Sequence, residues 1–528
     1  MRKVGRWLHI DAQQVADGVV VLRAIQARRC GCEAEERNEE QERAYVALSW
    51  YMPPRMSRRT LLAGISAAPL LAQSNSAKEP HFWTLAEASA ALQRRAISSE
   101  ELTKSCLARI RQVDPKLNAF ITLTVESALA QARECDRRPS RNPLHGVPIA
   151  LKDNIDTAGI RTTAASRVFF DRVPPEDAEV AARLKAAGAV MLGKLNLDEM
   201  AFEGTGTTSC FGPVHNPWNL DRITGGSSAG SAAALAAGLC YGSVGSDDGG
   251  SVRIPAAFCG ITGFKTSYGR VSTRGVVPSA YSLDTVGPMA RTAADTALML
   301  QAIAGFDPND TITANMPVPD YTAALRMPLS NLRLGIPRDY FFEGLYPDVA
   351  AAVDKAIRLL TPKFRDVRDI VLPRFQFVPN GSYDVELLHY QAPFFHKSPE
   401  LYHPWSRRQL TELESVTAVS YVETLRRIRE CRRDIRRIFE QVDVLLMPTK
   451  RDVAPTIQAT VDDTYKRPPS NCSAFNRFGT PAISVPCGFS SDSLPIGLQI
   501  VGPAFAEGRV LAVAHAYQQS TDFHRRHP

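Results

Sequence analysis

The sequence has none of the short cysteine and histidine spacings that hold metal ions. Its ten cysteines are scattered without a CxxC pair, and no HExxH segment occurs. These absences exclude the common zinc motifs and leave no pattern typical of a disulfide framework. Buried free thiols are therefore the expected state of the cysteines.

One regular histidine pattern remains, because His389, His396 and His403 recur every seven residues. That spacing would suit one face of a helix, but three prolines between residues 393 and 404 are expected to interrupt any such helix. We therefore expect no metal site at these histidines.

The chain also has little net charge and no long apolar run. Sixty-two basic and 55 acidic residues give a net charge of +7, which is too little to indicate a nucleic-acid partner. The apolar run at residues 61–72 is too short to span a bilayer as a stable helix. With 528 residues, 44% of them hydrophobic, the chain is long enough for one large domain or two ordinary ones.

The first 77 residues differ from the rest of the chain. Residues 1–55 contain an acidic run and no useful apolar periodicity, which suggests a start codon placed too early. From Met56 the sequence resembles a Tat secretory signal, with Arg58 and Arg59 before the apolar run and small polar residues after it. We expect residues 56–77 to be removed, so that residues 78–528 form a single domain that works in the periplasm or outside the cell.

Beyond the signal, helices and strands alternate. Thr84 with Glu87, and Ser98 with Glu101, have the spacing of helix-capping boxes, and Asp114-Pro115 is expected to stop the second helix. A further helix is expected over residues 176–187 and a last one over 509–519. Buried strands are expected over residues 147–151, 189–193, 239–246, 442–447, 482–485 and 497–501. This alternation predicts an α/β fold: a mixed sheet covered by helices on both sides.

A helix expected over residues 421–439 has one apolar and one basic face. Its basic face carries seven arginines between residues 426 and 437. An RNA-binding face is conceivable, but acidic neighbours, namely Glu423, Glu430, Asp434 and Glu440, favour an ordinary solvated face.

The stretch from residue 225 to 255 carries the chemistry. It holds two serine sites that follow glycines, Gly225-Gly226-Ser227-Ser228 and Gly249-Gly250-Ser251, on either side of an alanine-rich segment expected to be helical. Glycines before a serine allow a tight turn and leave backbone N–H groups free to stabilise an oxyanion beside the hydroxyl.

Two interpretations of this stretch compete. In the first, residues 226–230 form a G-x-S-x-G nucleophile elbow with Ser228 as the nucleophile. That motif requires a strand immediately before it, whereas residues 216–222 are expected to form a loop, and no late histidine has a suitable setting. In the second, Ser251 is the nucleophile, following the strand at residues 239–246, with amides of residues 248–251 around the carbonyl oxygen of the substrate.

The second interpretation needs a base other than histidine. Lys152 ends the apolar strand at residues 147–151, where an uncompensated lysine is costly. A lysine that acts through the other serine is the nearest candidate.

These segments resemble the amidase signature family in order and spacing. The resemblance rests on Lys152-Asp153, the serine motif at 225–231, the segment Asp247-Asp248-Gly249-Gly250-Ser251-Val252-Arg253, and the motifs at 257–260, 263–265, 479–486 and 495–499. It covers roughly residues 80–528.

The resemblance implies a Ser–cisSer–Lys triad. Ser251 would attack the amide carbon, Ser227, joined to Gly226 by a cis peptide bond, would pass on the proton, and neutral Lys152 would be the base. It also implies that Asp248, Gly249, Gly250 and Ser228 surround the oxyanion and substrate, and that Asp247, Arg253 and Ser231 support these turns.

Two residues depart from the family pattern, and two lysines compete with Lys152. Asp248 stands where a neutral residue such as threonine is usual, and Glu203 replaces a usual glycine in a segment that often lines the pocket. Lys194 and Lys265 lie outside the Lys-Asp motif and are expected to be structural.

The function predicted from the sequence is an amidase that hydrolyses a small carboxylic amide to an acid and ammonia or an amine. Neither a metal nor an organic cofactor is expected, nor a nucleic-acid partner or stable membrane insertion after signal removal, while a homodimer is an option. The alternatives are a glutamine-hydrolysing A subunit of a glutamyl-tRNA amidotransferase, which would be cytoplasmic, and an esterase with the same fold.

Overall fold

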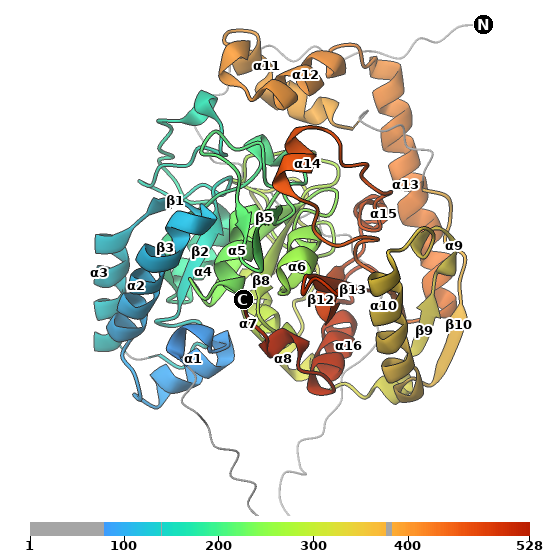
Figure 1. Ribbon diagram of the computed structural model, residues 1–528, viewed down its shortest axis with the longest axis horizontal. Helices are drawn as coiled ribbons and strands as arrows, with labels where there is room; N and C mark the ends of the chain where they lie inside the picture. The colour runs from blue at the N-terminus through green and yellow to red at the C-terminus, as the bar shows by residue number, and fades with distance from the viewer. Residues whose placement is uncertain (1–78, 139, 376–382) are drawn as a thin grey trace, which may run out of the picture. The chain divides into compact units, whose positions relative to one another are not determined.

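The computed structural model describes residues 79–528, except residue 139 and residues 376–382 (Figure 1). The Tat signal and the early start codon expected from the sequence lie outside these described residues. None of the described helices is long and apolar enough to cross a membrane.

Within the described residues, eleven strands form one mixed sheet in the order β1-β3-β2-β6-β8-β7-β12-β13-β11-β9-β10. β2 pairs in parallel with β3 and β6, whereas β6, β8, β7, β12 and β13 pair successively in an antiparallel manner. The strands are β1 (Phe120–Leu123), β2 (Pro148–Lys152), β3 (Val190–Leu195), β6 (Gly242–Asp247), β7 (Thr262–Lys265), β8 (Thr285–Ala290), β9 (Arg333–Ile336), β10 (Asp366–Asp369), β11 (Val444–Pro448), β12 (Ala482–Phe489) and β13 (Pro495–Val501).

Helices cover both faces of this sheet, as the sequence predicts for its central strands, which are buried along almost their whole length (Figure 1). The α-helices are α1 (Leu85–Gln93), α2 (Ser99–Leu117), α3 (Val125–Arg137), α4 (Glu179–Ala186), α5 (Ala229–Ala236), α6 (Arg253–Cys259), α7 (Ala293–Ile303), α8 (Tyr321–Ala324), α9 (Arg338–Phe341), α10 (Pro347–Leu360), α11 (Val385–Phe395), α12 (Pro404–Leu413), α13 (Ala418–Gln441), α14 (Ile457–Val461), α15 (Ser473–Arg477) and α16 (Glu507–Gln519). Short 3-10 turns are η1 (Pro80–Phe82), η2 (Arg167–Phe169), η3 (Glu199–Ala201), η4 (Leu329–Asn331), η5 (Thr361–Lys363), η6 (Pro399–Leu401) and η7 (Phe523–Arg525).

Both predicted capping boxes are present, at the starts of α1 and α2. The predicted end of α2 is wrong, because the helix continues through Pro115 to Leu117 and ends at Asn118 in the left-handed region. A proline one turn from a helix end removes only one hydrogen bond. The Asp114 carboxylate instead accepts the N–H groups of Ala119 and Phe120, so it stabilises the turn after the helix.

The histidine region differs from the expectation in one respect. α11 contains Pro393, so this proline does not interrupt the helix, whereas Pro404 begins α12. Among the described residues no group of three or more His, Cys, Asp or Glu side chains could hold a metal ion.

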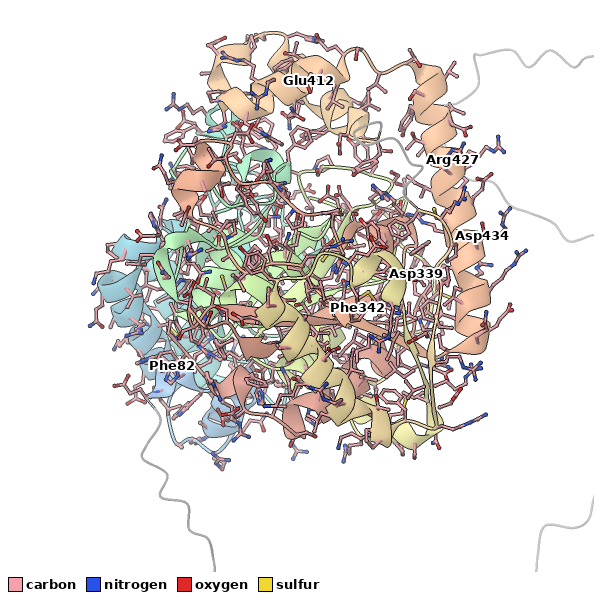
Figure 2. The ribbon with its side chains drawn as sticks, turned by 45° about the vertical axis from the view of Figure 1, so that its right-hand side comes forward. Phe82, Asp339, Phe342, Glu412, Arg427 and Asp434 are labelled. Atoms are coloured by element: carbon pink, nitrogen blue, oxygen red, sulfur yellow. The ribbon has the colours of Figure 1, made fainter. Side chains whose placement is uncertain are left out.

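The long helix α13 has the two faces expected from its sequence. Its buried side chains include Ile428, Cys431 and Ile435. Figure 2 shows Arg427 and Asp434 on the outer side of the helix. Acidic neighbours pair with the arginines there, in the pairs Arg426–Glu430, Arg427–Glu423 and Arg433–Asp434, which is typical of a solvated face.

Candidate functional site

Lys152 is the last residue of β2 and is fully buried. Its Nζ lies 2.7 Å from Ser227 Oγ and 2.9 Å from Ser246 Oγ, the latter on the neighbouring strand β6. Asn154 Nδ2 also donates to Ser246 Oγ, at 3.1 Å. Burial lowers the pKa of Lys152 to about 8, although the carboxylate of Asp248 acts in the opposite direction. At neutral to mildly basic pH a useful fraction of this lysine is therefore neutral.

The turn that carries Ser227 requires glycine at its centre. The Gly226–Ser227 peptide bond is cis, as the family resemblance implies. A Cβ added at Gly226 would lie 2.0 Å from a carboxylate oxygen of Asp198, so any other residue would displace this carboxylate. Gly226 N–H donates to Gly204 O, and Ser228 N–H donates to Ser251 O at 3.1 Å. These bonds bring the two serine turns together.

Ser228, the nucleophile of the alternative elbow interpretation, is fully buried, and its Oγ donates to Ser246 O at 3.4 Å. A strand does precede it, which corrects the expected loop at residues 216–222: β4 (His215–Asn216) and β5 (Asn219–Ile223) form a separate two-stranded sheet. That pair lies outside the main sheet, and the direction of the Ser228 hydroxyl opposes a nucleophilic role.

The turn that leads to Ser251 is built on a buried ion pair. Asp247 ends β6, and its carboxylate accepts the N–H groups of Gly250 and Val252 at 2.9 and 3.1 Å. Arg253 donates Nε and Nη2 to the same carboxylate, at 3.0 and 2.8 Å. Burial alone would raise the pKa of Asp247, but the charge and hydrogen bonds of Arg253 hold it well below its ordinary range. Asp247 therefore remains ionised and fixes the backbone immediately around the serine.

The C-terminal part of the chain completes this network. Arg253 Nη1 donates to Cys472 O and to Gln499 Oε1, each at 2.8 Å. Asn476 Nδ2 donates to Asp247 Oδ1, also at 2.8 Å. The sequence predicts no role for Cys472 or Asn476, and it includes Gln499 only as the last residue of the motif at 495–499. A polar Gln499 inside the apolar strand β13 was the available signal.

Among the predicted supporting residues, Ser231 has a different environment. Its side chain is fully buried in α5, and its Oγ has no hydrogen-bond partner among the described residues. Its expected support of the serine turn therefore does not rest on a hydrogen bond of its hydroxyl.

Asp248 lies in a group of carboxylates next to Lys152. Its Oδ2 accepts from Ser279 Oγ at 3.3 Å, while Asp284 accepts the Ser279 N–H at 3.0 Å. Burial and then the charge of Asp247 raise the pKa of Asp248, and burial together with the charge of Asp248 raises the pKa values of Asp284 and Asp384. The departure from the family pattern thus adds a further acidic side chain to this buried group beside Lys152.

Glu203 lies in the turn that holds Ser227. The Asp198 carboxylate organises this turn by accepting several successive N–H groups, among them Gly206 at 2.8 Å. Glu203 is buried and forms an ion pair with Arg467, but its second carboxylate oxygen has no partner among the described residues. Burial, and then the charge of Glu203, raises the pKa of Asp198 to about 6. The Glu203–Arg467 pair therefore belongs to the wall around the serine turns.

The two other lysines near the motif do not contact the serines. Lys194 Nζ donates to Ile155 O and Thr162 Oγ1, each at 2.6 Å, and lies 3.4 Å from Asp153 Oδ1. Lys265 Nζ donates to Thr266 O at 2.9 Å. Both are fully buried, but neither has a serine hydroxyl as a partner.

Comparisons with known proteins identify the family of the chain. A family model described as Amidase matches residues 101–511. The A subunit of glutamyl-tRNA(Gln) amidotransferase from Methylococcus capsulatus is 45% identical over 480 residues, which cover 85% of this chain and 99% of that protein.

Two solved structures show the same fold at lower identity. Peptide amidase from Stenotrophomonas maltophilia has a TM-score of 0.74 and 31% identity, with 85% of this chain and 98% of that chain covered. The A subunit of glutamyl-tRNA(Gln) amidotransferase from Thermotoga maritima has a TM-score of 0.71 and 31% identity, with the same shares covered. The chain therefore belongs to the amidase signature family of amide-hydrolysing enzymes.

Proposed function

We propose that this enzyme hydrolyses a carboxylic amide through an acyl-enzyme on Ser251, with Ser227 as proton relay and Lys152 as base. The 2.7 Å contact between Lys152 Nζ and Ser227 Oγ, in a site where burial lowers the pKa of the lysine, is the observation that carries the proposal.

The proton moves along this chain in both half-reactions. Ser251 Oγ forms a bond to the carbonyl carbon and gives its proton to Ser227 Oγ, whose own proton passes to Lys152 Nζ. When the C–N bond breaks, the proton returns through Ser227 to the leaving nitrogen, which departs as ammonia or an amine. Water then attacks the carbonyl carbon of the acyl-enzyme and gives a proton through Ser227 to Lys152. The bond between Ser251 Oγ and the acyl carbon breaks, the proton returns through Ser227 to Ser251 Oγ, and the acid is released.

The negatively charged oxygen of the tetrahedral intermediate is best stabilised by backbone N–H groups that donate to no other acceptor. Gly250 N–H is already donated to Asp247. Gly249 and Ser251 N–H have no acceptor among the described residues, so we assign them as oxyanion donors beside Asp248. Loss of one such donor typically costs about 3–4 kcal/mol in the barrier.

Burial of Lys152 lowers its pKa, and the Asp248 carboxylate opposes this shift, so both affect the pH range of this mechanism. The acid limb of kcat/KM should follow the deprotonation of Lys152, since only the neutral amine accepts a proton. The Asp248 carboxylate stabilises the ammonium form, so Asp248→Asn should lower the pKa of Lys152 and move the acid limb to lower pH, by about 1 on the pH scale. A pH profile of kcat/KM measures this. The exposed Asp221→Asn should leave the profile in place, and an unchanged or upward shift in Asp248→Asn would contradict the assignment of the base.

For the substrate, glutamine is the first candidate. The support is that relatives 40–45% identical along nearly their whole length are named as the A subunit of glutamyl-tRNA(Gln) amidotransferase. In that role the chain would release ammonia from glutamine, work beside partner subunits and remain in the cytoplasm, where glutamyl-tRNA is found.

A free amidase is the second candidate, and specific observations favour it. Glutamine carries a carboxylate, whereas Arg467, a described cation near the serine turns, already forms an ion pair with Glu203. The twin arginines Arg58 and Arg59 also point to export. An esterase activity would follow from the same acyl-enzyme.

Ammonia release distinguishes the two candidates. Wild type and Ser251→Ala would be compared on glutamine, propionamide and a C-terminal peptide amide, with hydroxylamine added to trap the acyl group as a hydroxamate. A kcat/KM for glutamine at least about tenfold above the other amides supports the first candidate, and the reverse supports a free amidase. Hydroxamate formation that persists in Ser251→Ala would refute the mechanism for both.

A further inference from the structure

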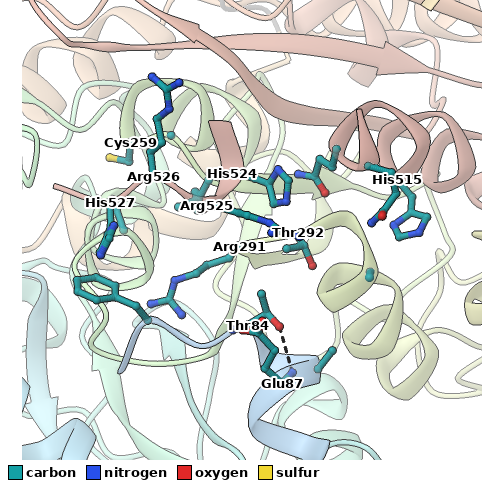
Figure 3. A pocket seen from close by; sticks show the side chains of 18 of the residues that line it. Thr84, Glu87, Cys259, Arg291, Thr292, His515, His524, Arg525, Arg526 and His527 are labelled. Atoms are coloured by element: carbon teal, nitrogen blue, oxygen red, sulfur yellow. Dashed lines mark hydrogen bonds between the residues drawn. The ribbon is translucent and has the colours of Figure 1, made fainter. Parts of the chain in front are cut away.

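A polar cavity separate from the serine turns lies on the side of the fold where the ends of the described chain meet (Figure 1). Its volume is about 190 Å³, and it is lined by the starts of α1 and α7, the end of α16 and the turn η7 (Figure 3). Pockets for drug-sized ligands are typically about 300–1,000 Å³, so this cavity suits only a small molecule or ion.

The charged side chains around the cavity are mainly cationic. Three arginines line it, Arg291, Arg525 and Arg526, against a single carboxylate among the lining residues, Glu87. His515, whose pKa is lowered by burial, His524 and His527 line it as well. Glu87 is already engaged, because its carboxylate accepts the Thr84 N–H at 2.8 Å in the capping box of α1.

The backbone N–H groups at the starts of α1 and α7 are not available to bind an anion. Asp295 accepts the N–H groups of Ala86 and Thr292, at 2.9 and 3.2 Å, and Gln518 Oε1 accepts that of Ala293 at 2.8 Å. Any site for an anion must therefore rest on the cationic side chains.

Arg291 is a buried cation without a direct carboxylate partner in the described part of the chain. It donates to the backbone carbonyls of His81 and Leu235, at 2.9 and 3.1 Å, and to that of Trp83. Burial lowers the pKa of its guanidinium, which shows the cost of keeping the charge there. The bond to Leu235 caps α5, so part of its role is structural, but carbonyl dipoles compensate a buried charge less fully than an anion does.

Arg525 has no such structural role. No carboxylate or carbonyl of the described residues accepts from its side chain, and Figure 3 shows its guanidinium directed toward Thr292, between Arg291 and His524. The neighbouring Arg526 points away in the same view; it pairs with Asp522 and lies over the rings of Phe489 and Phe523.

We propose that this cavity binds a small oxyanion of the phosphate type, held by Arg291 and Arg525. Charge-assisted hydrogen bonds from arginine suit the tetrahedral oxygens of such a group. The group can be free phosphate or the phosphoryl group of a small metabolite, since both present the same oxygens. The site is separate from Ser251 and does not depend on the proposed substrate.

Binding is tested on the full chain by thermal shift and by the fluorescence of Trp218, which lines the cavity and donates its indole N–H to Cys259 O. The chain contains five tryptophans, so Trp218→Phe identifies the local signal. Inorganic phosphate and glycerol 3-phosphate are titrated against sodium chloride at matched ionic strength, which removes general screening effects. The ligand that binds more tightly indicates whether the site takes free phosphate or the phosphoryl group of a small metabolite.

The matched variants are Arg525→Ala and Arg526→Ala, which remove the same charge from neighbouring exposed positions. We expect saturable stabilisation by a phosphate ligand, weakened at least tenfold in Arg525→Ala and less than threefold in Arg526→Ala. An equal effect of chloride, no saturation by either phosphate ligand, or equal weakening in the two variants would overturn the proposal.

Discussion

Replacement of Lys152 by methionine should lower kcat/KM for amide hydrolysis by about 10³-fold or more, because the relay from Ser227 then has no acceptor for its proton. Methionine retains the length of the side chain but has no basic nitrogen. Since Lys152 is fully buried and held partly neutral, an apolar side chain of similar size should leave the fold intact. Steady-state kinetics and circular dichroism on the same preparation would separate loss of catalysis from loss of structure.

Lys265→Met is the matched control for this experiment. Lys265 is equally buried, and burial followed by the charge of Arg253 lowers its pKa to about 7, so its titration resembles that of a catalytic base. Its Nζ nevertheless contacts a backbone carbonyl and no serine. We expect kcat/KM to fall by less than about tenfold in Lys265→Met. Equal losses in the two variants would mean that burial of a lysine, rather than the contact with Ser227, explains the effect.

Replacement of Arg253 by methionine should destabilise the fold by about 3–5 kcal/mol, because it leaves the Asp247 carboxylate buried without its cation. The side chains of Arg253 and Asp247 have no exposed surface, so the ion pair lies entirely inside the protein. Urea unfolding measures the loss, and activity should fall with it, since Asp247 holds the Gly250 and Val252 amides on either side of Ser251.

The double variant Asp247→Asn/Arg253→Met tests the cause. It removes both charges, so it should recover part of the stability that Arg253→Met loses. Arg333→Met, which breaks the partly exposed pair with Asp443, should cost much less stability than Arg253→Met. A double variant no more stable than Arg253→Met would show that packing of the arginine, and not its charge, supports the turn.

The pair also predicts how stability depends on pH. The folded-state pKa of Asp247 lies below its unfolded value, so the pair contributes its stability fully above the unfolded pKa near 4. This contribution decreases as the pH falls below that value, and it should be absent from the double variant.

Local sequence patterns predicted the parts of the fold that depend on neighbouring residues. The capping boxes at Thr84 and Ser98 and the apolar strand that ends at Lys152 are correct because their signals lie within a few residues. β7 and β8 were not predicted. β7 has only four residues, and β8 contains Gly287 and Pro288, which reduce the apolar signal although the strand is buried.

The site shows the same limit. The serine and lysine motifs identified the groups that meet, and the structure brings Lys152 and Ser227 into contact. Asn476 and Gln499 could not be placed, because they reach the Asp247–Arg253 pair from more than 220 residues away along the chain. The group formed by Asp248, Asp284 and Asp384 was also missed, since only folding brings these carboxylates together.

The central claim is that Ser251 is the nucleophile, and intact-mass labelling with a fluorophosphonate tests it most directly. Wild type would be compared with Ser251→Ala, Ser228→Ala, Ser227→Ala and Lys152→Met. The account predicts one adduct in the wild type, none in Ser251→Ala, slower labelling in Ser227→Ala and Lys152→Met, and retained labelling in Ser228→Ala. An adduct that persists in Ser251→Ala and disappears in Ser228→Ala would contradict the account and restore the nucleophile elbow.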